Sequence, residues 1–185
     1  MILSRLSYFQ LSTTYKGTKD MSLLIRHANP ETDSEHISRL IEICINEKRT
    51  ILNPYSEEEE RHYLENLQSR EAVFVAILDG FFAGFAGIVP RWPYSDKLSH
   101  CGESGTWVMP EYRGMGVGRA LWVKGILPWC QSNEFTHLGA MVMAHNVGSI
   151  AFYEKMGFNV VGSHHKVVRW GNEYLDTIEI ERLLE

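Results

Sequence analysis

The sequence has few cysteines, no excess of basic residues and no long hydrophobic run. Its 185 residues include three cysteines without CxxC spacing, and 18 Lys and Arg stand against 23 Asp and Glu, for a net charge of −5. Sparse, odd-numbered cysteines disfavour a disulfide framework and fit a reducing compartment such as the cytoplasm. The acidic balance argues against a nucleic-acid partner, because phosphate binding needs clustered cations. The longest apolar stretch, residues 78–89, is too short to cross a membrane.

Metal-site motifs are also missing. The eight histidines contain no HExxH pattern, and the adjacent His164 and His165 would point to opposite faces of a strand. We therefore expect no metal. An apolar fraction of 44% is that of a soluble globular protein, and the length fits one domain with a small-molecule or peptide partner.

The first residues differ in character from the rest. Met1–Lys19 is rich in Ser and Thr, has no acidic residue and lacks the apolar segment of a secretory signal. We expect residues 1–21 to be an N-terminal extension and residues 22–185 to form a single domain. An organelle-targeting leader, a disordered tail and a start codon placed ahead of Met21 remain open for the extension.

Strands and helices alternate along the remaining chain. Asp33–Ser34 is expected to cap the first helix, Ser56 with Glu59 forms a capping-box pattern, and Asp79–Gly80 is typical of a hairpin turn. Strands are expected at residues 22–28, 73–78, 81–89, 104–109, 137–144, 159–164, 166–170 and 176–183, and helices at 34–48, from 56 onward, at 118–131 and at 149–155. The order predicts a mixed α/β (α+β) domain.

A glycine-rich segment, Arg113-Gly-Met-Gly-Val-Gly-Arg-Ala120, follows a predicted strand and opens a predicted helix. A helix N-terminus offers unpaired N–H groups and a positive dipole end, and glycine lets a phosphate approach the backbone closely. The spacing fits neither a Rossmann fingerprint nor a Walker A loop starting at Gly114, because both need glycine at residue 119, which is Arg119.

The segment does resemble the Arg-x-x-Gly-x-Gly pyrophosphate loop of the GCN5-related N-acetyltransferase (GNAT) family, with Arg113, Gly116 and Gly118 at its fixed positions. A second stretch, Asn146–Phe158, is similar to another signature of that family. The resemblance covers about residues 22–185. It implies the GNAT fold, with a mixed central sheet of about seven strands flanked by about four helices, and acetyl-CoA as co-substrate. Within the family, Glu103-Ser104 and Gly171…Asp176 are most like phosphinothricin acetyltransferase-type members.

The resemblance also implies roles for single residues in holding acetyl-CoA. The backbone N–H groups near Val108 and Met109 would polarise the thioester carbonyl, where the strand parts from its neighbour. The pyrophosphate would lie on the loop Arg113, Gly114, Met115, Gly116, Val117, Gly118, Arg119 and Ala120, with backbone amides favoured over either arginine side chain. Asn146 and Ser149 would also contact the cofactor, although Asn146 fits a helix N-cap equally well.

Two further residues match catalytic positions of the family. Tyr153 would protonate the departing sulfur, with core packing as the alternative, and Glu103 would act as general base, directly or through water. His100 and His145 are alternative bases, because their ordinary pKa suits the task. For the acceptor, Tyr55, Arg91, Trp92 and Tyr94 offer an aromatic box with one cation, suited to an amino acid carboxylate, or ordinary loop packing.

The function predicted is acetyl-CoA-dependent transfer of an acetyl group, in a ternary complex, to the primary amine of a small molecule or amino acid analogue. A protein or peptide N-acetyltransferase and a non-catalytic acetyl-CoA sensor are the alternatives. The presence of both Glu103 and Tyr153 argues against the sensor. The expected partner is a small-molecule amine, and neither nucleic acid nor a membrane is expected to bind. The protein is expected in the cytoplasm, and a homodimer is left open.

Overall fold

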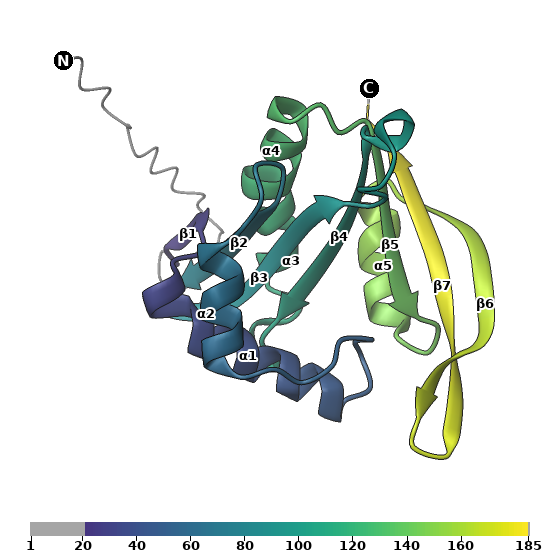
Figure 1. Cartoon of the computed structure of the whole chain (residues 1–185). Coiled ribbons are helices and arrows are strands. Elements are labelled where there is room, and N and C mark those ends of the chain that lie inside the picture. The colour runs from purple at the N-terminus through teal and green to yellow at the C-terminus, as the bar shows by residue number, and fades with distance from the viewer. Residues whose placement is uncertain (1–20, 185) are drawn as a thin grey trace.

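The computed structural model describes residues 21–184 as one seven-stranded mixed sheet with helices on both faces (Figure 1). The predicted N-terminal extension lies almost wholly outside the described residues. The strands are β1 Leu23–His27, β2 Ala72–Leu78, β3 Phe81–Pro90, β4 Cys101–Val108, β5 His137–Met143, β6 Asn159–Trp170 and β7 Glu173–Leu183, in the order β1-β2-β3-β4-β5-β7-β6. The helices are α1 Pro30–Asn46, α2 Glu57–Glu65, α3 Val117–Leu121, α4 Leu127–Ser132 and α5 Val147–Lys155. The predicted fold class is confirmed.

The core has two parts, one on each face of the sheet. Alternate residues of β2 point to opposite faces, so that Val73 and Val75 pack against α1 and α2 while Phe74 and Ala76 pack against α3, α4 and α5. Figure 1 shows α1 and α2 in front of the sheet. Within residues 21–184, every helix is too short or too polar to span a bilayer.

The start of α1 differs from the prediction. Asn29 is the N-cap, its side chain accepts from the Glu31 N–H, and Pro30 occupies the first turn. Asp33, predicted to cap the helix together with Ser34, lies inside its first turns. Its buried carboxylate accepts from the Asn29 N–H at 2.6 Å and binds the Arg26 guanidinium through two hydrogen bonds of 2.5 and 2.9 Å. The Asn-Pro pair was the better start signal, because proline fits the first helical position.

The capping box of α2 is confirmed, with the Ser56 and Glu59 side chains each bound to the other's backbone N–H. The helix predicted at residues 118–131 begins at Val117 and contains a π turn at Trp122–Ile126 between α3 and α4. Pro128 follows this turn. Proline lacks the N–H that a regular helix needs and its ring crowds the preceding turn, which explains the wider turn here.

The C-terminal hairpin has two strands where three were predicted. Residues 159–164 and 166–170 belong to one strand, β6, which crosses a register shift at Lys166, whose φ is +56°. The Gly171–Asn172 turn then leads into β7, as predicted. A bulge lets one strand continue through a residue that leaves the regular pattern, and the sheet therefore has seven strands.

The parting of β4 and β5 positions the site. Within residues 21–184 they are the one parallel pair of this sheet, and they pair over three residues only, from Cys101–His137 to Glu103–Gly139. Beyond Glu103 the two strands diverge, and Figure 1 shows them together at one end and apart at the other. The rest of β4 pairs with β3 alone, while β5 pairs with β7 along its whole length.

Candidate active site

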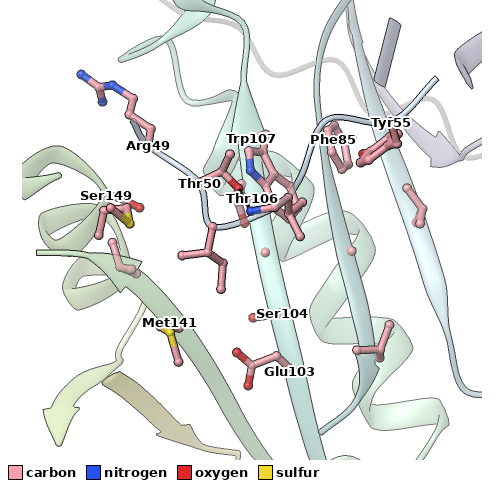
Figure 2. Close-up of a pocket in the computed structure, with 18 of the residues that line it drawn as sticks. Arg49, Thr50, Tyr55, Phe85, Glu103, Ser104, Thr106, Trp107, Met141 and Ser149 are labelled. Carbon is pink, nitrogen blue, oxygen red and sulfur yellow. Dashed lines mark hydrogen bonds between the residues drawn. The ribbon is translucent and has the colours of Figure 1, made fainter. Parts of the chain in front are cut away.

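A cavity of about 500 Å³ lies where β4 leaves β5, and the segment between α1 and α2 covers it. Figure 2 shows the Glu103 carboxylate extending from β4 toward Met141 on β5, with Trp107 and Phe85 farther along. The lining residues are Arg49–Leu52, Tyr55, Glu59, Glu60, Tyr63, Val73, Phe85, Gly87, Val89, Glu103–Trp107, Met141–Met143, Ser149 and Tyr153. The cavity therefore brings both predicted catalytic residues, Glu103 and Tyr153, to one space.

The backbone of β4 directs one of the two predicted amides into the gap. The Met109 N–H donates to the Ala83 carbonyl at 3.0 Å, and the Arg91 N–H donates to the Cys101 carbonyl at 3.0 Å. Because backbone groups of an antiparallel strand alternate in direction and the β3–β4 register is unbroken, the Val108 N–H points away from β3, toward the space that β5 leaves. Met109 was thus predicted wrongly as a free donor.

The glycine-rich loop leaves a row of backbone amides without a partner. Among the residues described, five N–H groups of this loop have no hydrogen-bond acceptor: those of Gly114, Gly116, Val117, Gly118 and Arg119. The Ala120 N–H is not one of them, because it donates to the Gly116 carbonyl at 2.9 Å, and the Met115 N–H donates to the Tyr112 carbonyl at 3.3 Å. Positive φ angles at Gly114 (+77°) and Gly116 (+84°) hold the loop open at the helix start.

The Arg113 side chain holds this loop in place. Its Nε donates to the Val108 carbonyl at 3.1 Å, and its two Nη atoms lie 3.0 and 2.7 Å from the Glu47 carboxylate oxygens. The guanidinium is therefore bonded to the end of β4 and to Glu47 just beyond α1. The groups of the loop that are free to bind an anion are the backbone amides. Arg119 is exposed on the outer side of the helix start.

Tyr153 reaches the cavity from α5 and is 3% exposed. Its hydroxyl lies 3.4 Å from the Thr106 hydroxyl, which also accepts from Trp122 Nε1 at 2.8 Å. Burial raises the pKa of Tyr153 to about 12, and the Thr106 hydrogen bond opposes this. The side chain is therefore protonated at neutral pH. Core packing, the alternative interpretation, holds as well, since the ring meets Trp122 and Phe158 edge to face.

Glu103 marks the point at which β4 and β5 separate. Burial raises the pKa of its carboxyl, while the nearby Arg91 and a hydrogen bond from the Met141 N–H lower it. The carboxylate lies 3.0 Å from Arg91 Nε. A carboxylate with a raised pKa at the wall of a cavity is suited to accept a proton. The alternative bases His100 and His145 are exposed and do not line the cavity.

The predicted acceptor box is not assembled. The Arg91 guanidinium lies over Gly139, where a Cβ would overlap it, and contacts Glu103, Glu179 and Glu181. These contacts follow from the register, because Glu103, Gly139 and Glu181 form one row across β4, β5 and β7. The Arg91 guanidinium, which was expected to bind a substrate carboxylate, is therefore already paired with three carboxylates of the protein.

The other members of that box are divided. Trp92 stacks on Arg91 and Tyr94 is 81% exposed, and both lie outside the cavity lining. Tyr55 does line the cavity.

The residues predicted to contact the cofactor from α5 lie at its start. Asn146 is the N-cap of α5: its side-chain oxygen accepts from the Ser149 N–H at 3.3 Å and from Arg49 at 3.1 Å. Ser149 lines the cavity.

Glu60 is a residue of the site that was not predicted from the sequence; it is 5% exposed and lines the cavity. In the sequence Glu60 belongs to the acidic run at residues 57–60, which favours a helix start because carboxylates stabilise the positive end of the helix dipole. Glu60 nevertheless stands four and seven residues before Leu64 and Leu67, so helical spacing places it on the same inward face. Its position in the apolar stripe was the available signal.

Comparisons with known proteins agree with this geometry. A family model described as the acetyltransferase (GNAT) family matches residues 37–158. The chain belongs to the GNAT family. It is therefore an acyltransferase by family, and the predicted GNAT fold is confirmed by solved structures. No curated protein matches the sequence.

Three solved GNAT-type structures illustrate the likeness. A ribosomal-protein-alanine N-acetyltransferase from Brucella melitensis is 26% identical, with 87% of this chain and 99% of that chain covered and a TM-score of 0.77. The yncA acetyltransferase from Salmonella typhimurium, solved with acetyl-CoA, is 20% identical over 89% and 95%, with a TM-score of 0.80. A phosphinothricin acetyltransferase from Sinorhizobium meliloti, in complex with acetyl-CoA, is 22% identical over 88% of each chain, with a TM-score of 0.74.

Substituting Gly116 tests the row of free amides. Gly116→Val places a β-branched residue at φ +84°, a backbone conformation that such residues disfavour. The loop must then adopt another conformation, in which the amides are no longer aligned. We expect the acetyl-CoA Kd from calorimetry to rise at least tenfold. Gly171→Val is a matched control, since Gly171 has φ +60° and equally open surroundings but lies in the β6–β7 turn. An unchanged Kd in Gly116→Val would contradict the assignment of the loop.

The buried carboxyl of Glu60 predicts a pH-dependent stability. Burial raises the pKa of Glu60 from 4.5 to about 7, and a hydrogen bond with Tyr55 opposes this. Between these pH values the unfolded chain releases a proton that the folded chain retains, so the folded state loses stability as pH rises, and the loss is complete above about pH 7. We therefore expect the free energy of unfolding of Glu60→Gln, relative to that of the wild type, to increase as the pH rises from 5 to 8, by at most roughly 3 kcal/mol.

Urea denaturation at the two pH values measures this gain. Glu58→Gln removes an exposed carboxylate from the same helix and should show no pH-dependent difference. An equal effect of Glu60→Gln at pH 5 and pH 8 would show that the Glu60 carboxyl is not shielded from water.

Proposed function

We propose that this protein transfers an acetyl group from acetyl-CoA to the primary amine of a small molecule, by direct attack in a ternary complex. The observation that carries the proposal is the opening between β4 and β5. The Glu103 carboxylate and the buried Tyr153 side chain line one cavity there, and the Val108 N–H points into the gap beside it. The free amides of the glycine-rich loop lie beyond the end of β4 and suit a pyrophosphate.

Acetyl-CoA supplies an activated acyl group in this reaction. The loop amides of Gly114, Gly116, Val117, Gly118 and Arg119 would hold its pyrophosphate, and Asn146 and Ser149 stand at the start of α5 beside the opening. Because Arg113 is paired with Glu47, its role is to fix the loop. Arg113 would therefore affect affinity through the loop's shape.

Glu103 would remove a proton from the ammonium of the acceptor, which is needed because an alkyl amine in water is almost wholly protonated at neutral pH. The freed nitrogen attacks the thioester carbonyl carbon, forming the C–N bond as the C–S bond breaks. The Val108 N–H would donate to the carbonyl oxygen as negative charge develops there. Tyr153 would give its proton to the departing sulfur and regain one from the acetylated nitrogen. The net products are an amide, a thiol and one proton.

A protein N-terminus is a second candidate acceptor. It is favoured by the 26% identity to the Brucella melitensis enzyme, which is a ribosomal-protein-alanine N-acetyltransferase and is covered over 99% of its length. Two phosphinothricin acetyltransferases have the same fold at lower sequence identity. Together with the Glu103-Ser104 pair, this similarity supports an amino acid analogue as acceptor. A thiol-release assay with acetyl-CoA across small amines and peptides separates these candidates, and no release with any of them would overturn the proposal.

Tyr153→Phe tests the proposed acid. The variant keeps the aromatic packing against Trp122 and removes only the hydroxyl, so we expect kcat to fall at least tenfold with little change in the acetyl-CoA Kd. Tyr174→Phe, at an exposed tyrosine outside the cavity, is the matched control and should keep wild-type kcat. A near-normal kcat in Tyr153→Phe would remove this residue from proton transfer.

A further inference from the structure

The part of the cavity beyond Glu103 has aromatic and aliphatic walls. Phe85 and Trp107 stack with ring centroids 4.7 Å apart, and Tyr55 and Tyr63 approach from the α2 side. Val73, Gly87 and Val89 of β2 and β3 also line it. Figure 2 shows Phe85 between Trp107 and Tyr55, with Glu103 at the other end of the view. An apolar group of an acceptor would be buried here at a favourable free energy.

The charged groups of these walls are mostly acidic. Among residues 21–184, three carboxylates line the cavity, those of Glu59, Glu60 and Glu103, and one cation, Arg49. Arg49 is already paired with the Glu47 carboxylate at 3.1 Å and with the Asn146 side-chain oxygen at 3.1 Å. The carboxylate of Glu59 accepts from the Ser56 backbone and hydroxyl.

An anionic acceptor would therefore find no unengaged cation on these walls within the part of the chain that the structure describes. Arg91, the cation nearest to Glu103, lies outside the lining and is held by Glu103, Glu179 and Glu181. A buried carboxylate or phosphonate without a positive partner is strongly disfavoured, and a second negative charge nearby adds to the cost. Glu60 provides such a charge, because it faces the cavity beside Tyr55 and Tyr63.

We infer that the acceptor is a primary amine on an uncharged aromatic or aliphatic body, and that Glu60 excludes acceptors that carry a carboxylate or phosphonate as well. The inference rests on the proposed function and narrows it, since it sets aside free amino acids and their anionic analogues. The amine end would lie at Glu103, and the apolar end against Phe85, Trp107 and Tyr55.

Binding of matched pairs tests the inference without requiring turnover. The pairs are 2-phenylethylamine with L-phenylalanine, and hexylamine with 6-aminohexanoate, measured by calorimetry with coenzyme A present at pH 8, where Glu60 is ionised. We expect the member without a carboxylate to bind at least tenfold more tightly in each pair. A carboxylate member that binds as tightly as its partner, or the failure of all four to bind, would overturn the inference.

Glu60→Gln tests the assigned residue. Removing the charge should reduce the preference within each pair severalfold, whereas Glu58→Gln, an exposed position on the same helix, should leave it unchanged. Glu60→Met, a second neutral variant, serves if Glu60→Gln does not fold. An unaltered preference in a folded Glu60 variant would overturn the role of Glu60.

The proposed function fails separately from this inference. Acetylation of the preferred amines in separate samples that contain acetyl-CoA in place of coenzyme A, measured by thiol release, supports both. Preferential binding without any acetyl transfer would leave the acceptor subsite standing and overturn the acetyltransferase proposal.

Discussion

The separation of β4 from β5 is the constraint on which the site depends. A strand inside a sheet normally satisfies its N–H and C=O groups on both sides, because an unpaired backbone group away from water is costly. Here the parallel pairing ends at Glu103–Gly139, and β4 continues with one neighbour only. The backbone groups on its other side, the Val108 N–H among them, then face the gap between the two strands, where a substrate can pair with them.

The separation is supported by side chains at its point of origin. Glu103 accepts from the Met141 N–H across the gap, and the Ser104 hydroxyl donates to the Gly139 carbonyl at 3.4 Å. Arg91 lies over Gly139 and joins Glu103 to Glu179 and Glu181. These contacts fix the angle at which the strands part. A carboxylate in the proposed role of base thus also belongs to the scaffold that shapes its cavity.

The glycine-rich loop between β4 and α3 supplies the amides of the predicted pyrophosphate site, and its backbone conformation depends on its own glycines. Gly114 and Gly116 adopt positive φ, and the Arg113 side chain joins the loop to Val108 and Glu47. The loop is therefore tied to the strand that carries the predicted oxyanion donor. This link fixes the position of the loop amides relative to the Val108 N–H.

Local patterns were enough for most elements and for the glycine-rich loop. The Ser56–Glu59 capping box, the Asp79–Gly80 turn and the apolar spacing of α1 depend on neighbours within a few residues, and the structure has each of them. The errors came where a local signal competed with another. Asp33 was read as a cap although Asn29-Pro30 precedes it, and Pro128 was passed over in a helix that widens into a π turn.

The sequence by itself determined the family, the order of the elements and the residues that meet at the opening, because short motifs and hydrophobic periodicity encode them. Only the tertiary structure decided which of those groups are free to act. Arg91 is paired with two carboxylates that lie about 90 residues later, in β7, and the Met109 N–H is bonded to β3. Glu60 becomes a cavity wall only when α2 packs over the sheet. Pairing and burial are long-range properties, since they depend on which strands and helices come to lie side by side.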